Sequence, residues 1–218
     1  MKLLLTLSLA AAATALPAQQ ARRTTTSPSQ SKGFRLIAHL TDPSHDLNPP
    51  VNGWALGTIH TGAGQNAAVF SEPSSYSRIF YQNGTAEQVA SRQTTIVTDS
   101  GTPPFPSSLI TQGAGEPPRI VDISVGEGTA NAVVEKENEG GPVLVNGLGE
   151  GSYMACKAVV PYYQTEYVTL QYLYGEGGKV PEGCVRIELV PECAVLNELP
   201  EGSLSSHEFA VDVACVGV

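Results

Sequence analysis

Hydrophobic and polar residues alternate in short runs along this chain. Apolar side chains fall on every second position in residues 34–40, and residues 185–189 and 209–213 repeat the pattern. A period of two places the apolar side chains on one face of a β-strand and the polar ones on the other. We therefore predict half-buried strands in these three segments.

Further short runs are rich in β-branched and aromatic residues and are bounded by Gly, Pro, Asn or Asp, which is typical of strands between turns. These runs span residues 54–60, 67–71, 78–82, 94–98, 119–125, 143–145, 153–159 and 167–174. Short strands separated by turns predict an all-β fold, either a single antiparallel β-sandwich or a barrel-like domain.

Two segments depart from the strand pattern. Thr85 and Gln88 have the spacing of a capping box, which predicts a helix of one or two turns ending at Ser91. Residues 127–141 are rich in Glu and Gly, so we predict a solvated loop or hairpin tip there.

The first residues have the pattern of a secretory signal peptide. Lys2 precedes an apolar run from Leu3 to Ala12, and Ala13-Thr14-Ala15 has the small residues of a cleavage site. The run is too short to span a bilayer, so we expect a secreted, extracellular protein. We predict a signal peptide at 1–15, a short propeptide at 16–23, a flexible Thr/Ser-rich tail at 24–32 and a single β domain at 33–218.

Acidic side chains outnumber basic ones, 21 to 12, and the net charge of the whole chain is −9 at pH 7. Cleavage after Arg23 would make the charge more negative, because the removed segment contains three basic residues and no acidic residue. Such a surface repels nucleic-acid phosphates and anionic membranes. We expect no nucleic-acid partner, and the C-terminus lacks the pattern of a lipid-anchor signal, so we also expect no membrane anchor.

The four cysteines, Cys156, Cys184, Cys193 and Cys215, lie in the last third of the chain. An even number of cysteines in an exported protein favours two disulfides, and the absence of a C-x-x-C motif disfavours a zinc site. A strand after Cys184 rises about 3.3 Å per residue, which places Cys184 and Cys193 too far apart for a bridge. The other pairings stay open.

Histidine and aspartate gather near the first predicted strand. His39, Asp42, His45 and Asp46 fall within eight residues, and His60 comes at the end of the next strand. Imidazole and carboxylate groups bind divalent transition metals, so these five residues are candidates for a metal site or for acid–base chemistry. The alternative is structural, because the residues from Asp42 to Ser44 also form a strong turn signal. We favour the turn.

Nucleophilic catalysis has no recognisable motif in this sequence. The chain has no Gly-x-Ser-x-Gly motif, and paired cysteines leave no free thiol. We therefore predict no catalytic residues and no cofactor, and we expect a protein that is not an enzyme.

Five of the eight tyrosines fall between Tyr162 and Tyr174. Rings on a protein surface can stack on the apolar faces of sugars, which makes Tyr162, Tyr163 and Tyr167 candidate ligand-binding residues. Tyrosine is also a good strand residue that packs across strands, and we favour packing for this group.

Asn83-Gly84-Thr85 is the only N-x-[ST] motif in the chain. It follows a predicted aromatic strand, so we expect Asn83 at a hairpin tip and carrying a glycan.

Several motifs resemble those of an uncharacterised family of small secreted proteins of filamentous ascomycete fungi, known only as a domain of unknown function. They are residues 43–47, 51–54, 59–64, 80–85 and 153–156. The resemblance continues to Cys215 and implies a fungal, extracellular, cysteine-bridged β domain. It implies no catalytic residues.

These observations together favour a secreted structural or interaction protein without catalysis, acting at the cell wall or at the host interface. Its expected partner is a cell-wall polysaccharide or an extracellular protein. The alternative is a lectin-like carbohydrate-binding module, and a secreted hydrolase or metal-binding protein is a third interpretation.

Overall fold

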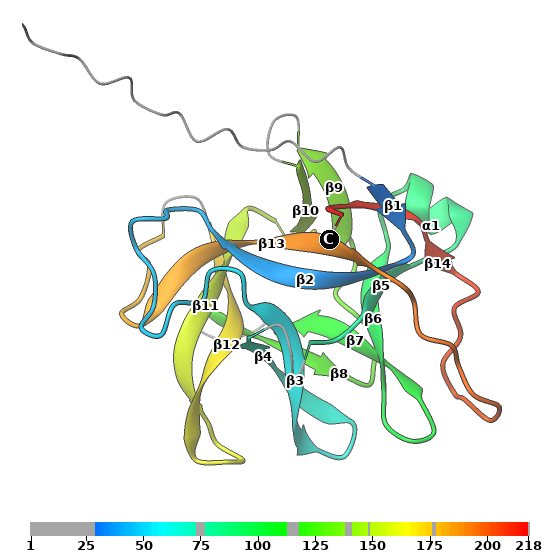
Figure 1. The fold of residues 1–218 in the computed structure, drawn as a ribbon, viewed down its shortest axis with the longest axis horizontal. Helices are drawn as coiled ribbons and strands as arrows, with labels where there is room; N and C mark the ends of the chain where they lie inside the picture. Colours follow the sequence, from blue (N-terminus) through cyan, green and yellow to red (C-terminus); the bar gives the residue numbers. More distant parts are fainter. Residues whose placement is uncertain are drawn as a thin grey trace, which may run out of the picture.

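Antiparallel strands account for nearly all of the regular structure in the computed structural model of the protein (Figure 1). The structure describes residues 29–72, 77–112, 118–137, 141–147, 149–175 and 178–217. The predicted signal peptide and propeptide lie outside the described residues. Within the described part, no helix is long and apolar enough to cross a membrane.

The strands, in chain order, are β1 (Ser29–Ser31), β2 (Gly33–Leu40), β3 (Ala55–Gly62), β4 (Gln65–Ser71), β5 (Phe80–Asn83), β6 (Thr95–Ser100), β7 (Phe105–Thr111), β8 (Arg119–Ser124), β9 (Val133–Glu137), β10 (Gly141–Val145), β11 (Gly151–Val160), β12 (Thr165–Tyr174), β13 (Cys184–Ala194), β14 (Ala210–Val211) and β15 (Val213–Cys215). The helix α1 (Ala86–Ala90) follows β5.

The large sheet has the strand order β11-β13-β2-β3-β4-β12-β8-β7-β6-β5-β14. Strand β11 also pairs with β12, β2 with β5, and β4 with β8, so the described strands close into a nine-stranded antiparallel barrel. Of the two architectures predicted from the sequence, the barrel is the one the protein adopts. The β3–β4, β6–β7 and β11–β12 hairpins project from one end of the barrel, while β9, β10 and α1 lie at the other (Figure 1).

Large apolar side chains fill the inside of the barrel. Phe34, Leu36 and Ala38 on β2 have no exposed surface, which confirms the alternation seen in the sequence. They belong to one buried cluster with residues from the other strands, among them Leu56, Phe70, Phe80, Ile96, Leu109, Ile123, Leu170 and Leu189. Because side chains occupy the interior, a binding surface is expected on the outside or at an end of the barrel.

Three strands are absent from the sequence prediction: β1, β7 and β9. Strand β7 contains Pro106 and two serines, so it lacks the apolar composition of a typical strand, yet its ladder with β6 is regular. The prediction of a loop or hairpin tip over residues 127–141 is wrong for β9, which pairs with β10 from Val133↔Val145 to Glu137↔Gly141. Val133 is buried, so packing outweighs the polar composition of the segment.

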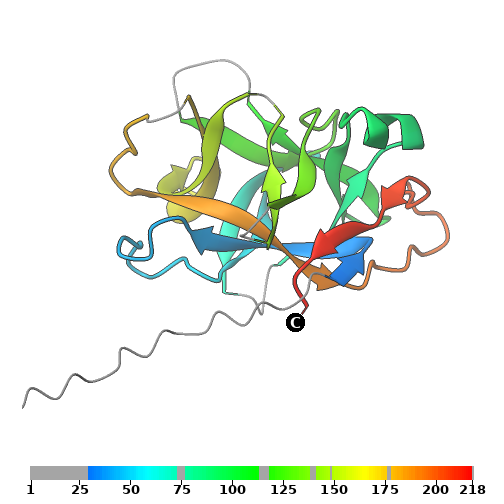
Figure 2. The ribbon, with the colours of Figure 1, turned by 90° about the horizontal axis from the view of Figure 1, so that it is seen from above.

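The N-terminal tail needs a similar correction. The sequence predicts a flexible tail over residues 24–32, but Ser29–Ser31 forms β1 and pairs with β15 (Figure 2). This pairing uses backbone groups and needs no apolar side chains. The Ser31 hydroxyl adds a hydrogen bond of 2.8 Å to the carbonyl oxygen of Ala194. Residues 24–28 lie outside the described part of the chain.

The predicted helix start is confirmed. Thr85 is the N-cap of α1, and its hydroxyl oxygen accepts a hydrogen bond of 3.3 Å from the backbone N–H of Gln88. The Gln88 side chain accepts one of 2.8 Å from the backbone N–H of Thr85. The helix is therefore held by both halves of a capping box.

Both predicted disulfides form. Cys156–Cys184 joins β11 to β13, and Cys193–Cys215 joins β13 to β15. Cys184 and Cys193 are not paired with each other, in agreement with the distance argument from the sequence. The second bridge fixes β15 beside the long strand β13, and β1 then adds to β15.

Candidate functional site

Four aromatic side chains gather at the end of the barrel where the hairpins project. We call this group, His60, Tyr162, Tyr163 and Tyr167, the aromatic cap. The ring centroids of Tyr162 and Tyr163 are 5.0 Å apart, those of Tyr163 and Tyr167 are 5.9 Å apart, and those of Tyr162 and His60 are 5.8 Å apart. The structure thus brings together the three tyrosines proposed from the sequence and adds His60.

The rings of the cap are open to solvent. Tyr162 is 59% exposed and Tyr163 is 41% exposed, while His60 is also exposed and Tyr167 is half-buried. Single exposed apolar side chains are common, but a contiguous group of exposed rings is characteristic of a binding surface. The cap is therefore the strongest candidate for a contact surface.

A tight loop holds Tyr162 and Tyr163 in place. The backbone N–H groups of Tyr163 and Gln164 both donate hydrogen bonds to the carbonyl oxygen of Val160, at 3.0 and 2.9 Å. Gln164 has a φ of 52°, and the Thr165 hydroxyl donates a hydrogen bond of 3.1 Å to the Tyr163 carbonyl oxygen. The buried Val160 anchors the loop below, so the backbone that carries the two rings has a defined conformation.

His60 is the last regularly paired residue before an irregularity in the neighbouring hairpin. The ladder between β3 and β4 shifts register between His60 and Gly62. Bulges of this kind redirect side chains at the end of a strand. The His60 ring meets Tyr162 edge-on at 83°, so two hairpins far apart in sequence contribute to one surface.

Within the tyrosine segment, the packing favoured from the sequence is right for Tyr172 and Tyr174, which pack in or against the core. It is wrong for the exposed Tyr162 and Tyr163. Tyr153 and Tyr172 belong to the barrel core, and their rings meet edge to face at 5.1 Å. The Tyr172 hydroxyl donates a hydrogen bond of 3.0 Å to the carbonyl oxygen of Gly149. Burial raises the pKa of Tyr153 and of Tyr172, so both stay protonated at neutral pH.

The structure does not gather the five candidate metal residues into one cluster. Asp46 accepts hydrogen bonds from the backbone N–H groups of Leu47, Val51 and Asn52, at 2.6, 2.9 and 3.4 Å, so its carboxylate shapes the loop. His39 is exposed opposite Glu188 in the β2–β13 ladder, and His60 lies in the cap. Among the residues that the structure describes, no three His, Cys, Asp or Glu side chains are placed as metal ligands.

Asp42, Ser44 and His45 form a hydrogen-bonded turn that only superficially resembles a catalytic triad. The backbone N–H and the hydroxyl of Ser44 donate to Asp42 Oδ1 at 2.9 and 2.6 Å. His45 Nδ1 lies 2.7 Å from Asp42 Oδ2 and 2.9 Å from Ser44 Oγ. A triad needs the acid and the nucleophile on opposite ring nitrogens, whereas here both are at Nδ1. The His45 side chain is also 78% exposed.

The bonds in this turn change the acidity of its carboxylate. The hydroxyl and the backbone N–H of Ser44, followed by His45, stabilise the charged form of Asp42 and lower its pKa to about 2. The structure therefore places Asp42 in the role favoured from the sequence, that of a turn residue.

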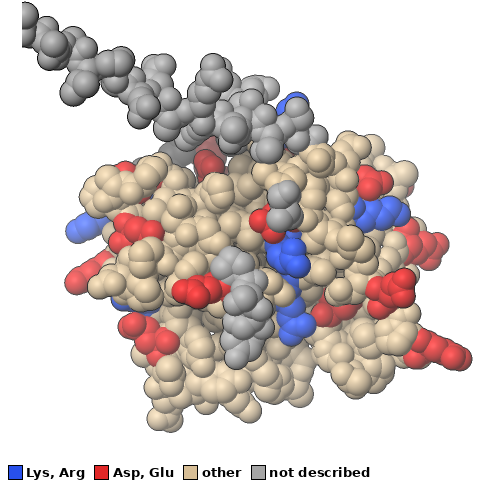
Figure 3. Space-filling view, in the orientation of Figure 1, with Lys and Arg blue, Asp and Glu red and all other residues tan. Residues whose placement is uncertain are grey.

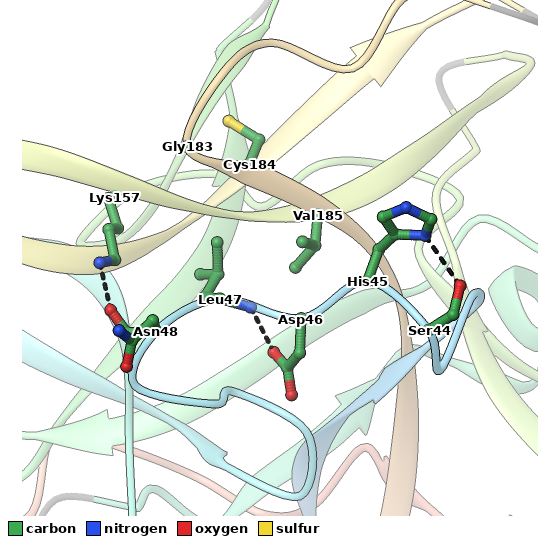
Figure 4. Close-up of a pocket in the computed structure, with 9 residues that line it drawn as sticks. All are labelled: Ser44, His45, Asp46, Leu47, Asn48, Lys157, Gly183, Cys184 and Val185. Carbon is green, nitrogen blue, oxygen red and sulfur yellow. Dashed lines mark hydrogen bonds between the residues drawn. The ribbon is translucent and has the colours of Figure 1, made fainter.

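A pocket of about 480 Å³ lies between this loop and the start of β13 (Figure 4). Leu47 points toward Val185 and Cys184, while the Asp46 carboxylate points away, to the backbone of its own loop (Figure 4). The Lys157 ammonium donates to the carbonyl oxygen of Asn48. The charged groups of Asp46 and Lys157 are thus engaged by the loop itself, which makes the pocket a weaker candidate than the cap.

Asn83 is not at a hairpin tip, which corrects the prediction. It is the last residue of β5, half-buried, and it pairs with Thr95 on β6 and Ala210 on β14. The chain then enters α1 and not a turn, because the capping box at Thr85 starts a helix directly after the motif.

The comparison with protein families shows which family the chain belongs to. The family model described as Domain of unknown function (DUF7907) matches residues 31–193, which is most of the sequence. The chain belongs to this family. The match confirms the resemblance to an uncharacterised family stated from the sequence motifs. A relative of this DUF7907 protein, antigenic protein SchS34 of the fungus Stachybotrys chartarum, is 37% identical over 198 residues, covering 86% of each chain.

No solved structure matches the chain. The part matched by the DUF7907 model contains the whole aromatic cap and three of the four cysteines. Cys215 and the strands β14 and β15 lie beyond it. The candidate surface therefore belongs to the segment that defines the family.

Proposed function

We propose that this DUF7907 protein is a non-catalytic extracellular binding domain, which acts at the cell wall or at the host interface and contacts its partner through the aromatic cap. The observation that carries the proposal is the exposed ring cluster, held by a hydrogen-bonded loop at an end of the barrel. Rigid aromatic side chains in solvent are the groups that most often supply binding free energy at protein surfaces.

The chemistry of the polar clusters supports a non-catalytic role. The Ser44 hydroxyl and the Asp42 carboxylate both lie at Nδ1 of His45, so Ser44 is not placed at the opposite nitrogen, where a histidine base would activate it. The same side chains stabilise a turn, which is a sufficient reason for their presence.

Two facts support an extracellular location. Both disulfides require an oxidising environment to persist. The relative from Stachybotrys is named an antigenic protein, which fits a protein that is exposed outside the cell.

The test compares retention of three secreted proteins on isolated fungal cell walls and on extracellular matrix from a host. They are the unchanged chain, the double variant Tyr162→Ala/Tyr163→Ala, and Val195→Ala, which changes a residue that is 87% exposed and outside the cap. We expect the unchanged chain and Val195→Ala to bind equally, and the double variant to bind at least about tenfold more weakly. Equal retention of all three would contradict the proposal, and so would steady release of sugars or peptides from the material.

A further inference from the structure

We infer that the ligand of the aromatic cap is a single chain of neutral sugar residues, and not a flat crystalline polysaccharide surface or an anionic polymer. This inference rests on the proposed function and names the ligand class for the same site. It is carried by the mutual orientation of the rings and by the uncharged loop tips with acidic groups beside them.

The rings of the cap face in different directions. Neighbouring rings are inclined by 70° between Tyr162 and Tyr163, and by 61° between Tyr163 and Tyr167. A flat surface can stack only on rings that are parallel to it, so a crystalline sheet would meet one ring and miss its neighbours. A single sugar chain can turn between one residue and the next, so successive residues can meet rings of different orientation.

The two loop tips of the cap carry no charge, and acidic residues lie beside them, Glu166 directly after the tyrosine loop and Glu127 just beyond the strand end that contacts Gly64. Residues 161–165 are Pro, Tyr, Tyr, Gln and Thr, and residues 61–65 are Thr, Gly, Ala, Gly and Gln. The lowest part of the molecule in Figure 3, where the β11–β12 hairpin ends, is correspondingly uncharged, although the protein is acidic overall. A polyanion would find no cation on the loop tips and would be repelled by Glu166 and by the acidic surface around them.

Polar side chains border the rings as a sugar ligand requires. Gln164 and Thr165 lie in the same loop as Tyr162 and Tyr163, and Gln65 lies in the neighbouring loop, all exposed. Amides and hydroxyls can both donate and accept hydrogen bonds, which matches the hydroxyl groups of sugars. Tyrosine itself combines an apolar face with a polar end, so stacking and hydrogen bonding can occur together.

The experiment separates the ligand classes. Binding of the secreted chain is measured by titration calorimetry and affinity electrophoresis for soluble β-1,3-glucan, mannan and chito-oligosaccharides, and for polygalacturonate as the anionic probe. Crystalline cellulose and crystalline chitin are tested by depletion. Each material is tested with the unchanged chain, Tyr162→Ala, Tyr163→Ala and the matched control Tyr162→Phe, which keeps the ring.

We expect binding to at least one soluble neutral glycan, and no binding to polygalacturonate or to the crystalline materials. Loss of one ring should weaken binding by about tenfold, while Tyr162→Phe should stay within about threefold. The alanine variants change exposed side chains, so their melting temperatures should equal that of the unchanged chain.

Other outcomes would overturn the inference in distinguishable ways. One such outcome is binding that depends on the cap but occurs only on a crystalline surface, on polygalacturonate or on a protein. That result would refute the neutral single chain as the ligand and would leave the proposed function standing. Glycan binding that is unchanged in both alanine variants would refute both. No binding to any glycan would refute the inference, and the wall and matrix assay would then decide the proposed function independently.

Discussion

His207 and Asp99 are 108 residues apart in the sequence and are joined by a hydrogen bond of 2.8 Å between Nε2 and Oδ2. The hydroxyl of Tyr81 donates to the other carboxylate oxygen at 3.5 Å, and the Tyr81 and His207 rings meet edge to face at 4.9 Å. Burial raises the pKa of Tyr81, so the hydroxyl keeps its proton at neutral pH. These contacts fix the segment before β14 against β5 and β6.

We expect His207→Ala to lower the free energy of unfolding by about 2 kcal/mol, because the nearly buried Asp99 carboxylate loses its closest donor. Guanidinium denaturation at pH 7 measures the change. The double variant Asp99→Asn/His207→Ala should lose less than the sum of the single variants, because the two residues interact. A loss below about 0.5 kcal/mol in His207→Ala would show that the pair does not hold the segment.

A second prediction concerns Asp42, whose pKa is lowered from 3.8 to about 2 by the Ser44 hydroxyl, the Ser44 backbone N–H and His45. A folded-state pKa below the unfolded one contributes stability that is present above about pH 4 and is lost as the pH falls toward 2. Carboxyl NMR titration of the folded chain should show this low value. Ser44→Ala should raise it toward 3.8, and an unchanged pKa in that variant would disprove the assigned cause.

The strands that form the barrel could be predicted where the side chains alternate with a period of two. Phe34, Leu36 and Ala38 are apolar on one face, and that face is the buried one. Strand β7 was missed because Pro106 and its neighbouring serines remove the apolar signal, while the ladder to β6 supplies the stability. Strand β1 was missed because its partner, β15, is at the other end of the chain and the pairing uses only the backbone.

The candidate site could be predicted in part. The density of tyrosines pointed to Tyr162 and Tyr163. It could not separate exposed rings from packed strand tyrosines, because both have the same local sequence signal. The sequence grouped His60 with the aspartates near Asp42, since all of these residues can bind metals. Only the folded arrangement of the β3–β4 and β11–β12 hairpins places His60 beside Tyr162, and a contact between distant hairpins has no local pattern.

A third prediction separates the two disulfides. Replacing either cysteine pair by alanine should lower the free energy of unfolding by about 3.5 kcal/mol in the chain-entropy model, since the bridged residues are 28 and 22 positions apart. The local effects should differ. Loss of Cys193–Cys215 should increase hydrogen exchange in β1 and β15, whereas loss of Cys156–Cys184 should increase it near residues 178–185. The same exchange pattern in both variants would contradict this division.

Asn83 provides the last prediction, because its surroundings change as the chain is made. The strand that covers it on one side, β14, comes from the last residues of the chain, so the Asn83-Gly84-Thr85 motif stays open until synthesis is almost complete. The predicted glycan can therefore be attached before β14 pairs with β5, and the half-buried Asn83 side chain does not prevent it.

We expect the chain secreted from a yeast or fungal host to lose mass on treatment with an amidase that removes N-linked glycans. Asn83→Gln should abolish that loss, and Asn66→Gln, outside any such motif, should not change it. A peptide containing unmodified Asn83 as the main species would refute the prediction. It would show that folding of β5 against β6, which follows closely in the sequence, closes the site before the glycan is transferred.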